Sequence, residues 1–170
     1  MFFTKTNGTP VGDISTYIEK WLDANHGQEV FIGTDSRQRG KHTHYVTVVV
    51  LHKKNRGGHV LLAQEVHPRK TVLMNRLWHE VSLTYDVAGE VLKGVKGLTP
   101  ENLQVHLDIN PDPIHASNVV YKAALGYVKS LGLPDANILA KPDAAAASFA
   151  ADNFLLPART IEFGEATVSG

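Results

Sequence analysis

Three aspartates in this sequence stand where a run of apolar residues stops. Asp35 ends the segment Val-Phe-Ile-Gly-Thr-Asp, Asp108 ends Val-His-Leu-Asp, and Asp143 ends Ile-Leu-Ala-Lys-Pro-Asp. Aspartate is a poor strand former, so a strand that leads into one needs a reason. A turn or a helix cap explains any one of the three taken alone. The set of three indicates carboxylates that gather at one end of a sheet and bind a metal ion.

Such a site has a well-defined chemistry. Carboxylates that lie close together repel each other, so one or more takes up a proton unless a cation is present. Mg²⁺ and Mn²⁺ are the expected ions, because they prefer oxygen ligands and keep waters that a substrate phosphate can replace. Two such ions about 4 Å apart could hold the attacking water and the leaving oxygen of an in-line phosphodiester displacement.

The N-terminal half of the chain is expected to contain one helix and three strands. Apolar residues at helical spacing predict a helix over about residues 13–25. Strands are predicted up to Asp35, over 44–52 and over 59–66, with a polar loop at 37–41 and a turn at 53–58. Short connections of this kind predict an antiparallel meander.

The C-terminal half alternates helices with strands. The pattern predicts a helix over 71–92, a strand over 104–108, a helix over 115–131, a strand over 137–140, an alanine-rich helix from Asp143 and a weakly structured tail after Pro157. Helical crossovers make the later strands parallel. The expected fold is a mixed five-stranded α/β sheet flanked by helices, with an extra N-terminal helix, in a single domain over residues 1–170.

This fold brings the acidic residues to one place. Ligands of such sheets bind beyond the carboxyl ends of the parallel strands, where Asp35, Asp108 and Asp143 are expected to meet. A fourth acid, Glu80, borders the apolar face of the long helix, with Leu77 and Thr84 as its neighbours. A solvated position on the helix surface is the alternative interpretation of Glu80.

The composition limits the classes of function. The 170 residues are 43% hydrophobic, which suits one domain with a sizeable core. Lys plus Arg and Asp plus Glu both count 17, so any nucleic-acid surface must be local. The absence of cysteine excludes disulfides and thiolate metal sites. Neither a signal peptide nor an apolar stretch long enough to span a bilayer is evident, so a cytoplasmic location is expected.

The ordered set of motifs resembles the ribonuclease H-like superfamily, and within it the YkuK-like family of little-characterised bacterial proteins. No single motif is specific, but together they cover most of the chain. The motifs are Ile32-Gly-Thr-Asp-Ser36, Arg76-Leu-Trp-His-Glu80, His106-Leu-Asp-Ile109, Lys141-Pro-Asp143 and Ala147-Ser-Phe-Ala-Ala-Asp152.

The resemblance implies a catalytic role for four acids. Asp35 would bridge two Mg²⁺ or Mn²⁺ ions, with Glu80 and Asp108 on one ion and Asp143 on the other. The segment at Asp143 also resembles the end of bacterial Holliday-junction resolvases, in which a second Asp follows one turn later. Here that position is Ala146, so the chain departs from the resolvase pattern.

Three classes of function remain open from the sequence. The first is a metal-dependent nuclease acting on RNA, an RNA/DNA hybrid or structured DNA. The second is a catalytically inactive member of the superfamily that binds nucleic acid or protein. The third, an ATPase-like nucleotide-binding protein, rests on a distant likeness of the segment Ile32–Asp35 to the first phosphate loop of actin-like ATPases, although 170 residues leave little room for their second domain.

Several other residues are secondary candidates. Ser36, Arg37 and Lys141 could contact a substrate phosphate, although a solvated loop explains the cationic stretch that Arg37 forms with Arg39 and Lys41. His42 and His44 share a strand face but lack a visible third zinc ligand. The remaining candidates are His79 as a proton shuttle, Asp112 and Asp152 as outer acids, and Trp21 and Trp78 as core residues.

Overall fold

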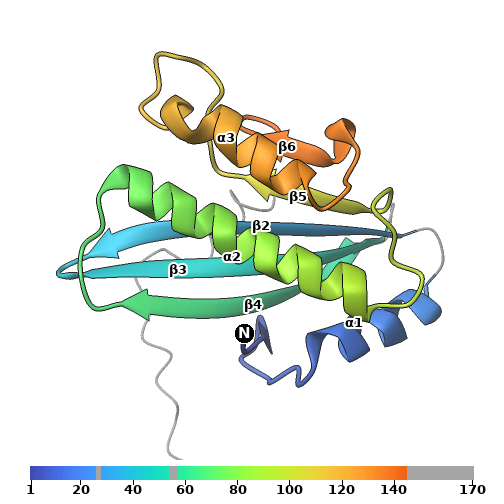
Figure 1. The fold of residues 1–170 in the computed structure, drawn as a ribbon. Helices are drawn as coiled ribbons and strands as arrows, with labels where there is room; N and C mark the ends of the chain where they lie inside the picture. The colour runs from blue at the N-terminus through green and yellow to red at the C-terminus, as the bar shows by residue number, and fades with distance from the viewer. Residues whose placement is uncertain (26–27, 54–56, 145–170) are drawn as a thin grey trace, which may run out of the picture.

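The described part of the chain forms a six-stranded mixed sheet with three α-helices (Figure 1). The computed structural model describes residues 1–25, 28–53 and 57–144. The strand order is β1-β4-β3-β2-β5-β6. The elements are β1 (Thr4–Lys5), α1 (Ile14–Asp23), β2 (Gln28–Arg39), β3 (His42–Lys53), β4 (Gly57–His67), α2 (Leu73–Gly94), β5 (Leu103–Leu107), α3 (Asn118–Lys129), a 3-10 turn (Asp135–Asn137) and β6 (Ile138–Ala140).

The predicted meander is formed by β2, β3 and β4, which pair antiparallel. The first of these strands is longer than predicted. It continues past Asp35 to Arg39, so the expected polar loop over 37–41 is wrong and the turn is confined to Gly40 and Lys41. The reason is that β3 pairs with β2 along its whole length, so that Asp35 lies opposite Val46 and Arg39 opposite His42. Backbone pairing with β3 outweighs the polar composition of this segment.

The parallel part of the sheet agrees with the prediction. β5 pairs parallel with β2 on one side and with β6 on the other. The ladder between β2 and β5 ends where Thr34 pairs with Leu107. Asp35 therefore stands at the end of the parallel ladder rather than at the end of its strand.

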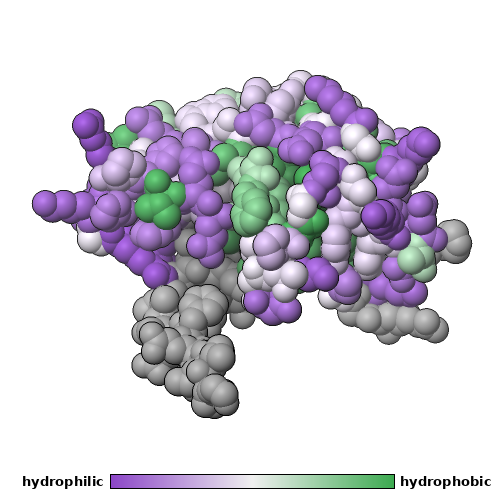
Figure 2. Space-filling view, turned by 90° about the horizontal axis from the view of Figure 1, so that it is seen from below, coloured by the Kyte–Doolittle hydropathy of each residue, from purple (hydrophilic) through white to green (hydrophobic). Residues whose placement is uncertain are grey.

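The sheet has six strands, not the predicted five. The additional strand, β1, pairs antiparallel with β4 through only two residues, Thr4 and Lys5. So short a strand leaves no alternation of apolar and polar residues in the sequence. Phe3 beside it is 1% exposed and anchors this segment in the core. Seen from below, where α1 and β4 lie, the surface is mostly hydrophilic around a smaller apolar area (Figure 2).

The three helices occur where the sequence predicts them, with ends shifted by a few residues. Asp13 caps α1 by accepting a hydrogen bond from the Thr16 amide at 2.7 Å. α2 lies over β2, and α3 contacts both α2 and β6 (Figure 1). The predicted alanine-rich helix after Asp143 and the tail after Pro157 lie outside the described residues. No helix in the described part of the chain is both long and apolar enough to span a membrane.

Close packing joins α1 to the end of α2. A Cβ atom on Gly94 would lie 2.5 Å from Ser15 Oγ and 2.9 Å from Ser15 Cβ, which is too close for two non-bonded atoms. Ser15 is buried on the face of α1 that also carries Ile14 and Ile18. Gly94 therefore permits the contact between the two helices.

Candidate metal centre

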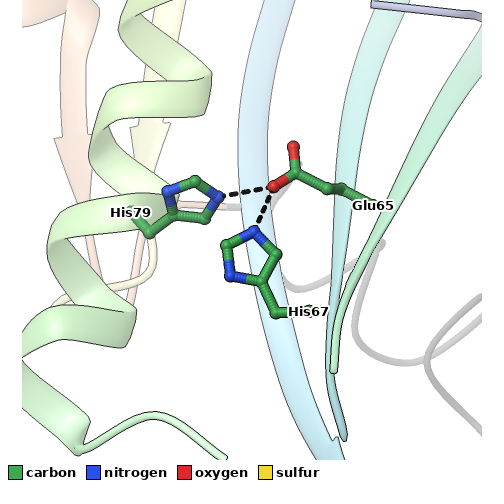
Figure 3. Close-up of side chains that lie close together, drawn as sticks. All are labelled: Glu65, His67 and His79. Atoms are coloured by element: carbon green, nitrogen blue, oxygen red, sulfur yellow. Dashed lines mark hydrogen bonds and ion pairs between the residues drawn. The ribbon is translucent and has the colours of Figure 1, made fainter. Parts of the chain in front are cut away.

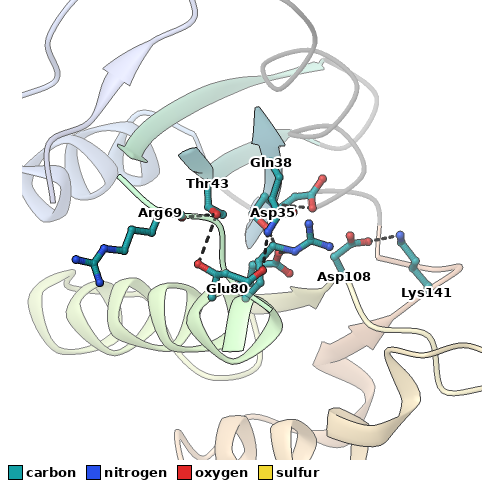
Figure 4. A network of polar contacts seen from close by, with 10 residues as sticks. Asp35, Gln38, Thr43, Arg69, Glu80, Asp108 and Lys141 are labelled. Carbon is teal, nitrogen blue, oxygen red and sulfur yellow. Dashed lines mark hydrogen bonds and ion pairs between the residues drawn. The ribbon is translucent and has the colours of Figure 1, made fainter. Parts of the chain in front are cut away.

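Three carboxylates from three different elements meet at the end of the parallel ladder (Figure 4). Asp35 belongs to β2, Glu80 to α2, and Asp108 directly follows β5. One oxygen atom from each residue lies within 4.8 Å of the other two. Asp35 is 8% exposed, Glu80 is 4% exposed and the Asp108 side chain is 15% exposed, so two members of the group are buried and the third is half-buried.

The fold explains this meeting. The register of β2 and β5 places Asp108 one residue beyond the last parallel pair, next to Asp35. α2 is fastened over β2 by the hydroxyl of Thr84, which lies 2.9 Å from both the Thr34 hydroxyl and the carbonyl oxygen of Glu80. These contacts fix the turn of α2 that presents Glu80.

Ser36 holds the two buried acids in position. Its hydroxyl donates a hydrogen bond to Glu80 Oε1, and its backbone amide donates to Asp35 Oδ1 at 2.6 Å. Arg76, one turn before Glu80 on the same helix, approaches with its Nε 4.0 Å from Glu80 Oε1. Ser36 was predicted as a possible substrate contact, but here its hydroxyl is directed to a carboxylate.

Burial and mutual repulsion raise the pKa of two carboxyls in this group, Asp35 and Glu80. The pKa of Asp35 rises to about 7, first because of burial and then because of the negative charge of Asp108. The pKa of Glu80 rises to about 8, mainly through burial, with Asp35 and Asp108 adding to the shift against the opposing hydrogen bond from Ser36. Without an added cation, protons are held at this site near neutral pH.

Lys141 provides a positive charge at one side of the group. Its Nζ lies 2.6 Å from Asp108 Oδ1 (Figure 4). Burial alone would lower the pKa of Lys141, but the hydrogen bond and charge of Asp108 outweigh burial and raise it. The side chain is still 43% exposed, so the ammonium group faces solvent as well as the carboxylates.

The donor set fits a hard divalent cation. It consists of carboxylate oxygens from three separate elements, which is the chemistry that Mg²⁺ and Mn²⁺ prefer. The raised pKa values of Asp35 and Glu80 mean that the protein alone stabilises the negative charge of the ionised carboxylates poorly. A divalent ion held by Asp35, Glu80 and Asp108 would balance the negative charge of their ionised carboxylates.

The fourth predicted acid lies apart from this group. Asp143 is exposed, and its backbone amide donates to the carbonyl oxygen of Ala140 in a turn at 2.9 Å. Within the described residues, the group that forms a possible ion site contains Asp35, Glu80 and Asp108 without Asp143. The role of Asp143 as a ligand stays a prediction.

The structure also places the secondary candidates. Arg37 is half-buried in β2, two residues beyond Asp35 and hence on the same face of that strand. His42 and His44 are edge-to-face neighbours with ring centroids 6.3 Å apart, and no third ligand joins them among the described residues. The Ile114 amide donates to Asp112 in a loop turn at 3.0 Å.

The remaining candidates divide between the core and the undescribed part of the chain. Trp21 and Trp78 pack against the main hydrophobic core, as predicted. Arg39 belongs to β2 and Lys41 to the turn that follows it. Asp152 lies outside the described residues.

His79 does not join the carboxylates as a proton shuttle would. Its Nε2 lies 2.9 Å from Glu65 Oε1, and His67 contacts the same oxygen. Neither Glu65 nor His67 was among the predicted site residues. A usable signal was present, because Glu-Val-His spans the end of the predicted strand over 59–66 and has the two-residue spacing that places side chains on one face of a strand.

The comparisons with known proteins agree with this fold. A family model described as Ribonuclease H-like matches residues 10–155 of the 170, and it bears out the predicted likeness to the YkuK-like family. Comparisons with curated proteins and with solved structures give no match. The family match covers most of the sheet and all three acids of the buried group. The chain belongs to the ribonuclease H-like family.

Proposed function

We propose that this protein is a metal-dependent phosphodiester hydrolase, a nuclease acting on RNA, an RNA/DNA hybrid or structured DNA. The observation that supports it most directly is the buried group of Asp35, Glu80 and Asp108, whose oxygens lie within 4.8 Å of one another. The family match makes nucleic acid the expected class of substrate.

In this proposal the three carboxylates hold Mg²⁺ or Mn²⁺. Such an ion, when bound, activates water and balances the charge that develops on the phosphate oxygens. The protein contributes rigidity, since Ser36 orients Glu80 and the Thr84 hydroxyl fastens the helix turn behind it. Asp143 remains the proposed fourth ligand, on the resemblance alone.

Two cationic side chains could meet the phosphate backbone. Lys141 presents a partly exposed ammonium group 2.6 Å from Asp108. Arg37 follows Asp35 on the same face of β2. Because the net charge of the chain is zero, local cations of this kind carry the electrostatic attraction to a polyanion.

A specific observation favours a second candidate, a catalytically inactive binding module. Lys141 already supplies a cation to Asp108, and Asp143 is exposed outside the group. An arrangement of this kind can balance part of the carboxylate charge without an ion. Under this alternative, nucleic-acid or protein binding would persist unchanged after metal is removed.

Titration with Mn²⁺ by calorimetry tests the proposal on the wild type and on Asp35→Asn. Cleavage of labelled RNA, hybrid and branched DNA is followed on the same samples. We expect saturable binding and cleavage in the wild type, and loss of both in Asp35→Asn. The matched control is Asp86→Asn, which makes the same change at an exposed position of α2 and should preserve both.

The outcomes separate the two candidates. Cleavage that survives Asp35→Asn would reject this site as the catalytic centre. Metal-independent binding of nucleic acid without cleavage under any condition would select the binding module. Binding of Mn²⁺ that Asp35→Asn leaves unchanged would show that the ion binds elsewhere.

A further inference from the structure

A second group of convergent ligands is formed by residues of β4 and α2 (Figure 3). Glu65 and His67 come from the end of β4, and His79 comes from α2, directly before Glu80. One ligand atom from each residue lies within 4.8 Å of the other two. Both imidazoles direct Nε2 to the same carboxylate oxygen, Glu65 Oε1.

The distance between these ligand atoms is close to the distance between two ligand atoms of a bound metal ion. Two ligands bound at 2.0–2.1 Å in tetrahedral geometry lie roughly 3.4 Å apart, and in octahedral geometry roughly 2.9 Å apart. His79 Nε2 and Glu65 Oε1 are 2.9 Å apart. A small outward movement of His67, which is in closer contact with Glu65, would complete a three-ligand site.

The surrounding packing holds the ligands in place. Tyr45 lies directly opposite Glu65 across β3 and β4 and is 1% exposed. Its ring packs edge-on against both imidazoles, with centroids 5.1 Å from His67 and 4.6 Å from His79. Because packing already holds the two imidazoles in place, they lose little conformational entropy when a metal ion binds. This favours a specific metal site over weak, non-specific binding at the surface.

The side chains also leave room for water on the metal. His79 is 31% exposed, and Glu65 and His67 are each 38% exposed. A three-ligand site at the surface therefore has open positions toward solvent.

We propose that Glu65, His67 and His79 form a binding site for a divalent transition-metal ion such as Zn²⁺. Two imidazoles and one carboxylate are the ligands that such ions accept, in contrast to the all-oxygen group at Asp35. Binding requires the neutral imidazole tautomer with its proton on Nδ1, so that the Nε2 lone pair faces the ion. The ion would replace the hydrogen bonds that Glu65 now accepts.

Such an ion would clamp the end of β4 to the first half of α2. His79 and Glu80 are consecutive residues, so the clamp acts on the helix turn that presents Glu80 to Asp35 and Asp108. The site is separate in its ligands from the carboxylate group, and it can exist whether or not that group supports catalysis.

Co²⁺ titration followed by visible absorption, with Zn²⁺ as competitor, tests the site in the full chain. The wild type should bind one Co²⁺ with nitrogen ligation, and Zn²⁺ should displace it. Glu65→Gln, His67→Gln and His79→Gln should each weaken Zn²⁺ binding by at least about 10- to 100-fold, the loss caused even by groups that only support a ligand. Glu65→Gln is the sharpest variant, because it keeps an oxygen that accepts hydrogen bonds from both imidazoles and removes only the charge.

Two controls complete the experiment. The double variant His42→Gln/His44→Gln removes two histidines at the same spacing on a neighbouring strand and should bind Zn²⁺ as the wild type does. Asp35→Asn should also retain this binding, which separates the site from the carboxylate group. Circular dichroism and thermal unfolding in EDTA identify the variants that fold, and only those are compared. Absence of saturable Co²⁺ binding in the wild type, or equal affinity in folded Glu65→Gln, would overturn the proposal.

Discussion

At the scale of single residues, the contact between Lys141 and Asp108 has the largest consequence for metal binding. The Lys141 ammonium lies 2.6 Å from one carboxylate oxygen of Asp108, a proposed ligand of the divalent ion. The ammonium group repels the divalent metal ion and competes with it for the carboxylate of Asp108. The same ammonium is also one of the two groups proposed to contact the substrate phosphate. Its two roles therefore act in opposite directions on ion binding and on substrate binding.

Replacing this lysine separates the two roles. In Lys141→Met, which keeps an unbranched side chain and removes the charge, we expect Mn²⁺ affinity to rise by roughly 3- to 10-fold because of lost repulsion between cations. Cleavage, where present, should need more nucleic acid for half-maximal rate. Calorimetry measures the first effect and substrate titration the second, with Lys129→Met on α3 as the control. Mn²⁺ affinity that falls in Lys141→Met would contradict the expected competition.

At the scale of elements, the site depends on how α2 is seated against its neighbours. Hydroxyl contacts from Thr84 fasten its middle over β2, and the absence of a side chain at Gly94 lets α1 approach its end. Glu80 in the first half of α2 and the packing at Gly94 therefore belong to the same 22-residue helix.

Gly94→Ala tests this packing. Alanine is the better helix former, but its methyl group would lie 2.9 Å from Ser15 Cβ, so we expect a net loss of about 1–3 kcal/mol in the free energy of unfolding. Gly126→Ala in α3 is the matched control, because nothing lies within 4 Å of the added methyl group, and it should stabilise by up to about 1 kcal/mol. Urea unfolding measures both. Equal stabilisation of the two variants would show that α1 does not pack closely on Gly94.

At the scale of the whole molecule, the buried carboxyls couple stability to pH. The folded protein holds protons on Asp35 up to about pH 7 and on Glu80 up to about pH 8, whereas the unfolded chain releases them near pH 4. His106 acts in the opposite direction at lower pH, because burial lowers its pKa to about 4. Between pH 6.5 and 8 the unfolded chain loses the remaining proton from His106, an effect smaller than that of the two carboxyls, so Asp35 and Glu80 determine the sign of the net contribution.

Between pH 6.5 and 8 the unfolded state binds fewer of these protons than the folded state. The free energy of unfolding in EDTA should therefore fall as pH rises, by about 2 kcal/mol from these two groups. Asp35→Asn should show a smaller fall, since it removes one titrating group and its repulsion. Saturating Mn²⁺ should oppose the fall, because ion binding becomes tighter as the carboxyls ionise. Urea unfolding at several pH values measures all three samples, and stability in EDTA that increases with pH over this range would contradict the expectation.

Much of the element order could be predicted because it follows from local patterns. The apolar spacing of the helices, the meander and the parallel strands all reflect residues close in sequence. The length of β2 could not be predicted, because residues 36–39 are polar and their strand conformation comes from pairing with β3. β1 was missed for a similar reason, since two residues form a strand only where β4 offers an open edge.

The sequence by itself determined the types of acid available and the strands and helix that carry Asp35, Glu80 and Asp108. Only the tertiary structure decided which side chains meet. It joined these three, left Asp143 exposed, paired Lys141 with Asp108, and turned His79 toward Glu65 and His67. The physical reason is that side-chain contacts depend on strand register and on the rotation of α2 over the sheet. Both are set by packing between residues distant in sequence, and not by the spacing of residues along the chain.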